Sequence, residues 1–418
     1  MSGKYKKLIF HIDVNSAYLS WSAIKLLQYG NNIDIRKIPS IIGGKEENRH
    51  GIVLAASIPA KKLGIKTGET IYSAKEKCKN LKIYLPDYNW YIKSSDALYE
   101  ILEEYSPKIQ RYSIDECFME MNNLGESYYE KANEIKNRIS KELGFNCNIG
   151  ISTNKLLAKM ASDFKPKNSV HTLFKEEIEK KMWPLDIRDL FMVGKATEIK
   201  LKDLNINTIG ELATFDINIL RDKLKSQGNL VYEYANGRDN SKVRKSNYLE
   251  IKGIGNSTTI SYDITTYKEA KDILLSLTES VTSRLRSSKK FCRVIVVSIK
   301  TNNFISYSHQ KKLTSYTDST NLIYKEVKEI FKESWKGESI RHLGIRLTGL
   351  SENNFYQENL FDFKKTEKEK NLDSTIDLIR KKYGKNSIVR SSFVNSGIRP
   401  LTGGTGAEEE YPMMSSIL

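Results

Sequence analysis

Apolar residues in the first part of the chain alternate between the spacing of strands and the spacing of helices. The strand-like runs lie at 7–13, 82–85, 109–121 and 146–152. The helix-like runs lie at 16–29, 92–105, 128–143 and 153–164. In chain order they predict a βαββαβ unit. A small, polar and basic section at 33–79 is inserted after the first helix, with two short apolar runs around Gly43-Gly44-Lys45.

A second βαββαβ pattern occupies the later part of the chain, with a helical region before it. Its strands are predicted near 254–260, 291–301, 304–313 and 340–350, and its helices at 267–288 and 319–334. Between the two units, 187–215 reads as two short helices joined by a glycine turn. This is typical of a helix-hairpin-helix, whose backbone amides can bind a DNA phosphate. An ordinary helical hairpin is the alternative.

Acidic residues follow two of the predicted strands. Asp115 and Glu116 lie at a tight bend between two apolar strand arms, and Asp13 ends the first strand, where Ser16 can cap the next helix. If the two strands are neighbours, the three acids converge. Three carboxylates fit a pair of Mg²⁺ or Mn²⁺ ions of the kind used in phosphoryl transfer. The alternative for the acidic bend is a solvated hairpin tip.

Length and charge indicate a multidomain protein with a polyanionic partner. A chain of 418 residues should divide into roughly two to four domains. The net charge is +16, and residues 241–350 hold 20 Lys and Arg against 10 Asp and Glu. Such an uneven excess favours a nucleic-acid-binding module over a merely soluble basic surface. No apolar run approaches a membrane span and no signal-peptide pattern is present, so we expect a cytosolic protein.

The cysteines and histidines add no site of their own. Cys78, Cys117, Cys147 and Cys292 show no CxxC spacing, and we expect them to be reduced packing residues. The five histidines are scattered, and none is assigned a role.

Three ordered motifs resemble the palm signatures of Y-family translesion DNA polymerases. They are Asp13-Val14-Asn15-Ser16-Ala17-Tyr18, Ser113-Ile114-Asp115-Glu116, and the run from Gly150 to Ser162, and the similarity spans about 7 to 361. The resemblance implies an α+β, multidomain right-hand fold with helix-hairpin-helix thumb. Its parts would be a palm at 1–32 and 80–170, fingers at 33–79, a thumb at 171–240, a linker at 241–250, a little finger at 251–352 and a tail at 353–418.

The resemblance also implies roles for the acids and for one aromatic residue. Asp13, Asp115 and Glu116 would ligate two Mg²⁺ ions, with Mn²⁺ as a possible substitute, and the Val14 carbonyl would be a backbone ligand. Tyr18 matches the steric gate that disfavours a ribose 2′-hydroxyl. From the sequence alone, Tyr18 is equally natural as a core aromatic.

The nucleotide-contacting positions depart from the commoner family pattern. Ala55, Ile58 and Lys61 stand where many members place Thr, Tyr and Arg, so Lys61 keeps the charge without the arginine fork. Asn15 replaces an acid seen in some members. Lys165 and Lys167 compete for the role of a triphosphate-binding lysine.

Further residues are assigned to DNA and to a protein partner. The residues expected to bind DNA are Gly194, Lys195, Arg244, Arg284, Arg286, Lys289, Lys290 and Arg293. Gln357, Leu360 and Phe361 resemble the peptide by which bacterial polymerases bind the sliding clamp. A short helix at 372–383 and a disordered end at 403–418 complete the predicted chain.

The sequence therefore predicts a bacterial, clamp-tethered, error-prone DNA polymerase that acts on primer-template DNA and deoxynucleotides. We expect a monomer in the cytoplasm, associated with the nucleoid. A two-metal nuclease is the alternative among enzymes. A catalytically silent DNA-binding and clamp-binding accessory protein is the alternative outside enzymes.

Overall fold

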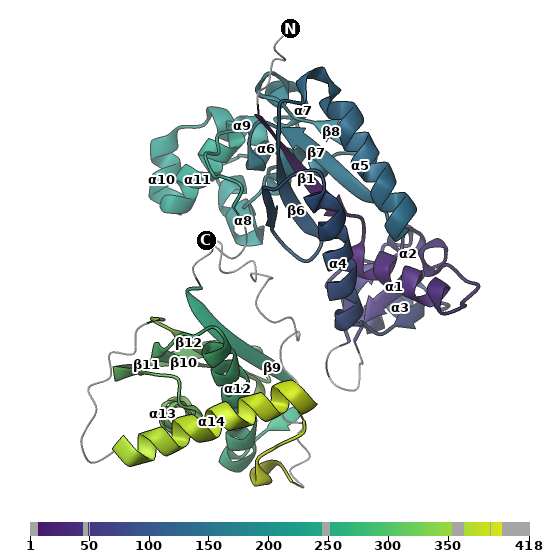
Figure 1. Ribbon diagram of the computed structural model, residues 1–418. Helices are drawn as coiled ribbons and strands as arrows, with labels where there is room; N and C mark the ends of the chain where they lie inside the picture. Colours follow the sequence, from purple (N-terminus) through teal and green to yellow (C-terminus); the bar gives the residue numbers. More distant parts are fainter. Residues whose placement is uncertain are drawn as a thin grey trace.

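The computed structural model describes residues 7–44, 49, 51–244, 251–352, 363–384 and 386–394 (Figure 1). In these ranges the strands form one five-stranded, one three-stranded and one four-stranded sheet. Within the described ranges, no helix is long and apolar enough to cross a membrane. All four cysteines are free thiols, three of them buried, in agreement with the packing role expected for them.

The five-stranded sheet has the order β5-β6-β1-β7-β8 and is built around its central strand. Its strands are β1 (Lys7–Val14), β5 (Ile109–Arg111), β6 (Glu116–Asn122), β7 (Cys147–Ser152) and β8 (Val170–Thr172). β1 runs antiparallel to both β6 and β7. β8 was not expected, because three residues are too few to show a period.

Helices cover both faces of this sheet. Leu8, Phe10 and Ile12 of β1 share a core with the helices α1 (Ala17–Gln28), α4 (Tyr88–Glu103) and α5 (Tyr128–Leu143). Alternate residues of β1 point to the other face, where Ile9 packs with Ala158 of α6 (Lys155–Ser162). His11 and Asp13 belong to this second, α6-covered face.

The three-stranded sheet has the order β3-β2-β4. Its strands are β2 (Ser40–Gly43), β3 (Val53–Ala56) and β4 (Lys82–Tyr84), and α2 (Ile58–Lys62) and α3 (Ile71–Lys77) accompany them. β4 pairs in parallel with β2. The predicted boundary at residue 80 would group β4 with the palm, whereas this strand pairs with β2 in the three-stranded sheet. A three-residue strand carries too little pattern to indicate its partner.

A helical region follows β8. It contains α7 (Ile178–Lys181), α8 (Lys195–Lys202), α9 (Ile209–Thr214), α10 (Ile217–Leu224) and α11 (Ser226–Ala235). These helices share one apolar core, which includes Leu190, Leu201 and Leu212. Gly194 is the N-cap of α8, and Thr208 begins α9 with a capping box to Glu211.

The four-stranded sheet has the order β11-β10-β12-β9. Its strands are β9 (Gly253–Ile264), β10 (Cys292–Thr301), β11 (Ser306–Thr317) and β12 (Ile340–Thr348). α12 (Tyr267–Ser287) and α13 (Thr320–Ser334) pack on one face through a core that includes Leu274, Phe331 and Ile345. The order of helices and strands in this unit is the predicted one.

A last helix, α14 (Phe363–Tyr383), lies across α12 and α13 (Figure 1). The sequence predicted only its second half, because the first half is charged and lacks an apolar stripe. Asp377 of α14 accepts hydrogen bonds from Arg286 Nε at 2.6 Å and Ser283 Oγ at 2.9 Å. Arg380 and Arg390 pair with Glu279, which is only 3% exposed. The C-terminal helix is therefore an integral layer of this unit.

Candidate active site

The register of the five-stranded sheet brings the three predicted acids together. Asp13 at the end of β1 lies directly opposite Glu116 at the start of β6. Residues opposite one another in an antiparallel pair point to the same face, with Cβ atoms about 5 Å apart. Asp115 precedes Glu116 and accepts a hydrogen bond from the Val14 amide at 3.1 Å through its backbone carbonyl. The acid that closes the first strand thus adjoins the acidic bend.

Burial and mutual repulsion raise the pKa of two of these acids. Burial, then the charges of Glu116 and Asp115, raise the pKa of Asp13 to about 7. Burial also raises the pKa of Asp115, although Ser113 Oγ donates a hydrogen bond to its Oδ1 at 2.5 Å. Closely spaced, buried carboxylates of this kind require a cation before all of them can ionise.

Lys159 of α6 is the cation that the metal-free chain itself supplies. Its Nζ lies 2.9 Å from both carboxylate oxygens of Glu116. Burial would raise the pKa of Glu116, but His11 and Lys159 beside it lower this pKa to about 2. Nε2 of His11 is 3.7 Å from Glu116 Oε2, beyond hydrogen-bond range, so Lys159 makes the direct contact.

His11 is fully buried beneath this ion pair. Its Nδ1 shares a 2.8 Å hydrogen bond with Ser162 Oγ, and Ser162 Oγ donates to the Lys159 carbonyl at 2.7 Å. Burial lowers the pKa of His11, and the neighbouring Glu116 opposes this shift. His11 and Ser162 therefore connect β1 to the turn of α6 that presents Lys159.

The donor chemistry of these residues fits a hard divalent ion. The carboxylates supply oxygen ligands, and one lysine leaves the group with net negative charge. In the part of the chain that the structure describes, no three His, Cys, Asp or Glu side chains are already gathered tightly enough to hold a metal. Glu116 pairs with Lys159.

Tyr18 lies beside the acids on the first turn of α1. Its ring stacks on Tyr91 of α4, with centroids 4.6 Å apart and an interplanar angle of 13°. Burial and the charge of Asp115 raise the pKa of Tyr18 to about 12. Ala55 is in the same small apolar cluster as Tyr18, whereas Ile58 is 67% exposed at the start of α2.

Lys61 reaches from α2 to the start of α1. Its Nζ donates a hydrogen bond to Ser16 Oγ at 2.8 Å. Ser16 occupies the N-cap position of α1, but its side chain makes no capping bond, so the predicted cap is wrong. Burial and the nearby charge of Lys167 lower the pKa of Lys61. The charge of Lys167 thus acts on Lys61, whereas that of Lys165 is not among the causes of the lowered pKa of Lys61.

Several basic residues expected to bind DNA are engaged within the protein. Arg286 donates to Asp377, to Asp373 and to the Asp318 carbonyl, and its side chain is only 14% exposed. Arg286 holds α14 on this unit, and its assignment to DNA stays a prediction. Arg293 donates to the carbonyls of Leu313 and Thr314.

The other predicted DNA residues differ in their surroundings. Arg284 donates to the Gly255 carbonyl at 3.1 Å, and Lys290 pairs with Glu352 at 3.1 Å. The remaining residues predicted to bind DNA are all exposed: Gly194, Lys195, Arg244 and Lys289. Gln357, Leu360 and Phe361 lie outside the described residues.

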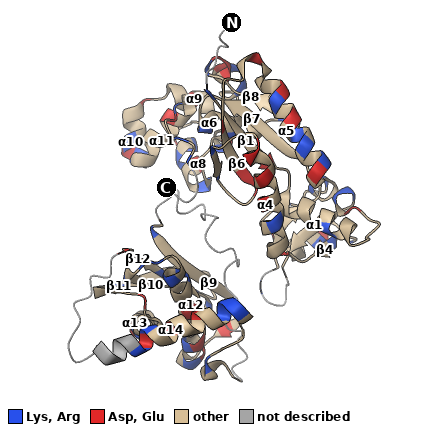
Figure 2. Ribbon diagram, in the orientation of Figure 1, with Lys and Arg blue, Asp and Glu red and all other residues tan. Residues whose placement is uncertain are grey.

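The surface of α5 carries both positive and negative side chains. Along α5, Lys and Arg alternate with Asp and Glu (Figure 2), and Arg138 pairs with Glu142 and Glu104. This helix has the mixed surface of a solvated face rather than that of a polyanion-binding one.

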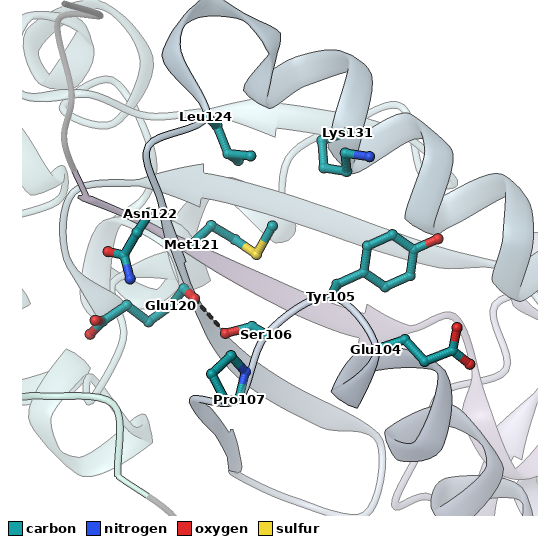
Figure 3. Close-up of a pocket in the computed structure, with 9 residues that line it drawn as sticks. All are labelled: Glu104, Tyr105, Ser106, Pro107, Glu120, Met121, Asn122, Leu124 and Lys131. Carbon is teal, nitrogen blue, oxygen red and sulfur yellow. Dashed lines mark hydrogen bonds between the residues drawn. The ribbon is translucent and has the colours of Figure 1, made fainter.

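A shallow hollow of about 360 Å³ lies at the far end of β6 from the acids (Figure 3). The charged side chains that line it are already paired within the protein. Glu120 is held by Lys7 and Lys108, Lys131 pairs with Glu134, and Glu104 pairs with Arg138. The lining residues therefore offer a ligand no unpaired charge.

Two residues of the site were missed by sequence reasoning. Lys159 is flanked by the apolar residues Ala158 and Met160 in α6, and this was the signal that it faces something buried and acidic. His11, at an inward-facing position of β1, was passed over with the other histidines.

Comparison with known proteins agrees with this geometry. The family model of the impB/mucB/samB family matches residues 12–163, and that of the family's C-terminal domain matches 251–360. DNA polymerase IV of Clostridium acetobutylicum is 51% identical over 92% of this chain and 98% of its own length. DNA polymerase IV 1 of Bacillus subtilis is 33% identical over 98% of both chains.

Solved structures share the fold. The "Y-family DNA polymerase chimera Dbh-Dpo4(243-245)-Dbh" aligns with a TM-score of 0.72 at 20% identity, covering 83% of this chain and all of its own. The "Dbh Ternary Complex" aligns with a TM-score of 0.56 at 20% identity over 82% of this chain and 98% of its own.

The fold and the acidic site define a Y-family polymerase, and the predicted α+β, multidomain fold is confirmed. Within that class, the chain belongs to the impB/mucB/samB family.

Proposed function

We propose that this chain extends the 3′ end of a DNA primer by two-metal phosphoryl transfer at Asp13, Asp115 and Glu116. As a member of the Y family it is a translesion, DNA-directed DNA polymerase. The observation that carries the assignment of the site is the pairing of Asp13 with Glu116 across β1 and β6.

Two Mg²⁺ ions, or Mn²⁺ in their place, are the proposed cofactors. When bound, such ions lower the pKa of the primer 3′-hydroxyl and offset the charge of the triphosphate. Asp13, Asp115, Glu116 and the Val14 carbonyl would hold them. Asp13 must lose its proton first, and Glu116 must share or leave the ammonium of Lys159.

The incoming deoxynucleotide is assigned to the space between α1 and α2. Tyr18 would pack under its sugar and exclude a 2′-hydroxyl. Lys61 and Lys167 would hold the triphosphate, because the two charges lie close enough to affect one another. Lys167 is preferred over Lys165 on this ground. Ala55 and Ile58 offer no hydroxyl, so we assign them apolar contacts only.

We assign the DNA duplex to the face of the four-stranded sheet opposite α12 and α13. This open face is made of four rows of paired residues: Val294, Lys312, Thr348 and Gly253; Val296, Gln310, Arg346 and Gly255; Ser298, Ser308, Gly344 and Ser257; Lys300, Ser306, His342 and Thr259. These rows hold three Lys or Arg and no acid. The small residues at their centre leave room for a phosphate backbone, and Arg346 is exposed.

The remaining assignments follow the family's domain plan. The five-stranded sheet would be the palm, the three-stranded sheet the fingers, the helical region the thumb and the four-stranded unit the little finger. Gly194 and Lys195 at the start of α8 would bind a DNA phosphate without reading sequence. Arg244 and Lys289 are further candidates, since both are exposed.

We also propose a sliding clamp as protein partner, through Gln357, Leu360 and Phe361. The support is the sequence motif and its position just past the little finger. A monomer in the bacterial cytoplasm, associated with the nucleoid, is the proposed state of the protein.

Extension of one labelled primer on a DNA template tests the proposed activity. Lengthening of the primer in the presence of Mg²⁺ and deoxynucleotides is the expected result. Shortening would instead indicate a two-metal nuclease, and an unchanged primer would indicate an accessory protein. Extension opposite an abasic or bulky lesion then defines which templates are accepted.

A further inference from the structure

Tyr18 is supported from behind by a group of aromatic residues on α1 and α4. Tyr91 stacks face to face on Tyr18. Tyr88 stands edge-on to both rings, with centroids 6.1 Å from Tyr18 and 5.8 Å from Tyr91. Trp21 closes the group at 5.9 Å from Tyr91. The Tyr18 ring is thus packed against the rings of Tyr91 and Tyr88.

Tyr91 is the buried centre of this group. It is 0% exposed, and its hydroxyl shares a 2.8 Å hydrogen bond with Ser22 Oγ of α1. Two further contacts join the helices at the same level. Trp90 Nε1 donates to the Trp21 carbonyl at 2.9 Å, and Lys25 pairs with Asp87, the N-cap of α4. Neither helix can move away from the other without breaking these bonds.

From this geometry we infer that Tyr91 is a positioning residue for sugar selectivity, which fixes the Tyr18 ring against the incoming nucleotide. The inference rests on the proposed role of Tyr18 as steric gate. Without a closely packed neighbour, the Tyr18 ring could tilt when the 2′-hydroxyl of a ribonucleotide contacts it. A flat, close-packed ring behind it removes that freedom, and displacements of about 1 Å are enough to change reaction rates strongly.

The two sides of Tyr91 have separable effects. Its ring supports Tyr18, whereas its hydroxyl only connects α4 to Ser22. Tyr91→Leu removes the ring and leaves a void that Tyr18 can enter. Tyr91→Phe keeps the ring and loses only the hydroxyl, so it is the matched control. Tyr91→Met keeps most of the volume without a flat ring, and it serves where the leucine variant folds poorly.

The experiment measures kcat/KM for a deoxynucleotide and for the matching ribonucleotide, and compares the ratio between variants. A general loss of stability would lower both rates together and leave the ratio unchanged. We expect Tyr91→Leu and Tyr91→Met to lower the ratio by about tenfold or more, the order produced by one lost contact in a specificity pocket. Tyr91→Phe should keep the wild-type ratio.

Tyr18→Ala, measured alongside, separates the inference from the function on which it rests. If Tyr18→Ala lowers the ratio while Tyr91→Leu and Tyr91→Met keep it, the role of Tyr91 is overturned and the gate stands. If Tyr18→Ala also keeps the wild-type ratio, Tyr18 is no gate and the role of Tyr91 is overturned with it.

Discussion

Lys159 and the acids around it form a buried group of opposite charges, and this balance decides whether a metal can bind. The lysine ammonium neutralises Glu116 from 2.9 Å. It also lies over the rings of Tyr112 and Phe191, at 5.3 and 5.5 Å from their centroids. Lys159 is thus held in place, and a divalent ion must bind against its charge.

Removal of Lys159 should therefore tighten metal binding. We expect Lys159→Met to increase the affinity for Mn²⁺ by about tenfold or more, since a like charge is removed from the site. The metal-free variant should also unfold at a lower temperature, because Glu116 loses the ammonium group that pairs with it. Electron paramagnetic resonance titration with Mn²⁺ measures the affinity directly.

Lys155→Met is the matched control, because Lys155 lies one turn earlier on α6 and contacts Gln110 rather than an acid of the site. Its Mn²⁺ affinity should equal that of the wild type. A Lys159→Met variant that binds Mn²⁺ more weakly would contradict this account of the charge balance.

The raised pKa of Asp13 makes metal binding depend on pH. This pKa rises from 3.8 to about 7 in the folded chain, so the native state keeps a proton that the unfolded state loses. Stability of the metal-free chain should fall as the pH rises from about 4 to about 7. A divalent ion binds the ionised carboxylate, so Mg²⁺ should raise the Tm more at pH 8 than at pH 6.

Thermal unfolding with and without Mg²⁺ at both pH values measures this difference. Asp13→Asn has no proton to lose, and its response to Mg²⁺ should be small and similar at both. An equal Mg²⁺ response of the wild type at pH 6 and pH 8 would show that Asp13 is not a ligand.

Close contact between β7 and α6 sets the position of Lys159 at the level of whole elements. Gly150 of β7 lies opposite His11 of β1 and faces α6. A Cβ atom at Gly150 would lie 2.0 Å from the Ala158 carbonyl oxygen and 2.4 Å from the Ser162 amide nitrogen. Only glycine lets the helix approach the sheet this closely.

Gly150→Ala should therefore destabilise the protein by about 3 kcal/mol, as overpacking of a filled interior does. Urea unfolding gives the free energy. Gly194→Ala is the comparison, since no atom lies within 4 Å of a Cβ there and its effect should stay below about 1 kcal/mol. Equal effects of the two substitutions would contradict the close contact of β7 and α6.

Arg346 and Arg286 belong to opposite faces of the four-stranded unit, and their substitution should have different effects. Arg346→Ala should weaken DNA binding and reduce the slope of log K against log salt by about 1. Arg286→Ala should leave that slope unchanged. It should instead cost about 3 kcal/mol of stability, because Asp373 and Asp377 lose their partner.

Fluorescence anisotropy at several salt concentrations, with thermal unfolding of the same samples, separates these outcomes. A reduced salt slope for Arg286→Ala, together with an unchanged slope for Arg346→Ala, would place the DNA on the other face.

Most elements of the fold could be predicted from the sequence because they are long and periodic. Short elements were predicted less completely: β8, with three residues, was missed, and β4 was predicted as a strand at 82–85 without its pairing to β2. The sequence also could not show whether a charged side chain points to solvent or to a partner within the protein. Arg286 appeared as one of a basic cluster, and its acidic partners follow 87 and 91 residues later in the chain.

The sequence predicted the acids of the site but not the residues that pack around them. Asp13, Asp115 and Glu116 stand at strand ends, where the local pattern marks them. Lys159 reaches Glu116 across 43 residues of chain, and only the packing of α6 on the sheet brings them together. Tyr91 likewise reads as an ordinary core residue until α4 lies beside α1.

Over the whole molecule, affinity for DNA and the chemistry are assigned to different units. The net charge of +16 is concentrated in the region of the four-stranded sheet, whereas the acids lie in the five-stranded one. A change at an acid should therefore abolish catalysis and leave DNA binding in place. This separation is the main consequence of the account.

Primer extension by Asp115→Ala, with DNA binding measured by anisotropy on the same preparation, tests that claim most directly. Glu130→Ala, an exposed acid on α5, serves as control. We expect extension by Asp115→Ala to fall by about a thousandfold or more, with DNA affinity within about twofold of wild type and Glu130→Ala unchanged in both. Normal extension by Asp115→Ala would contradict the assignment of the metal site.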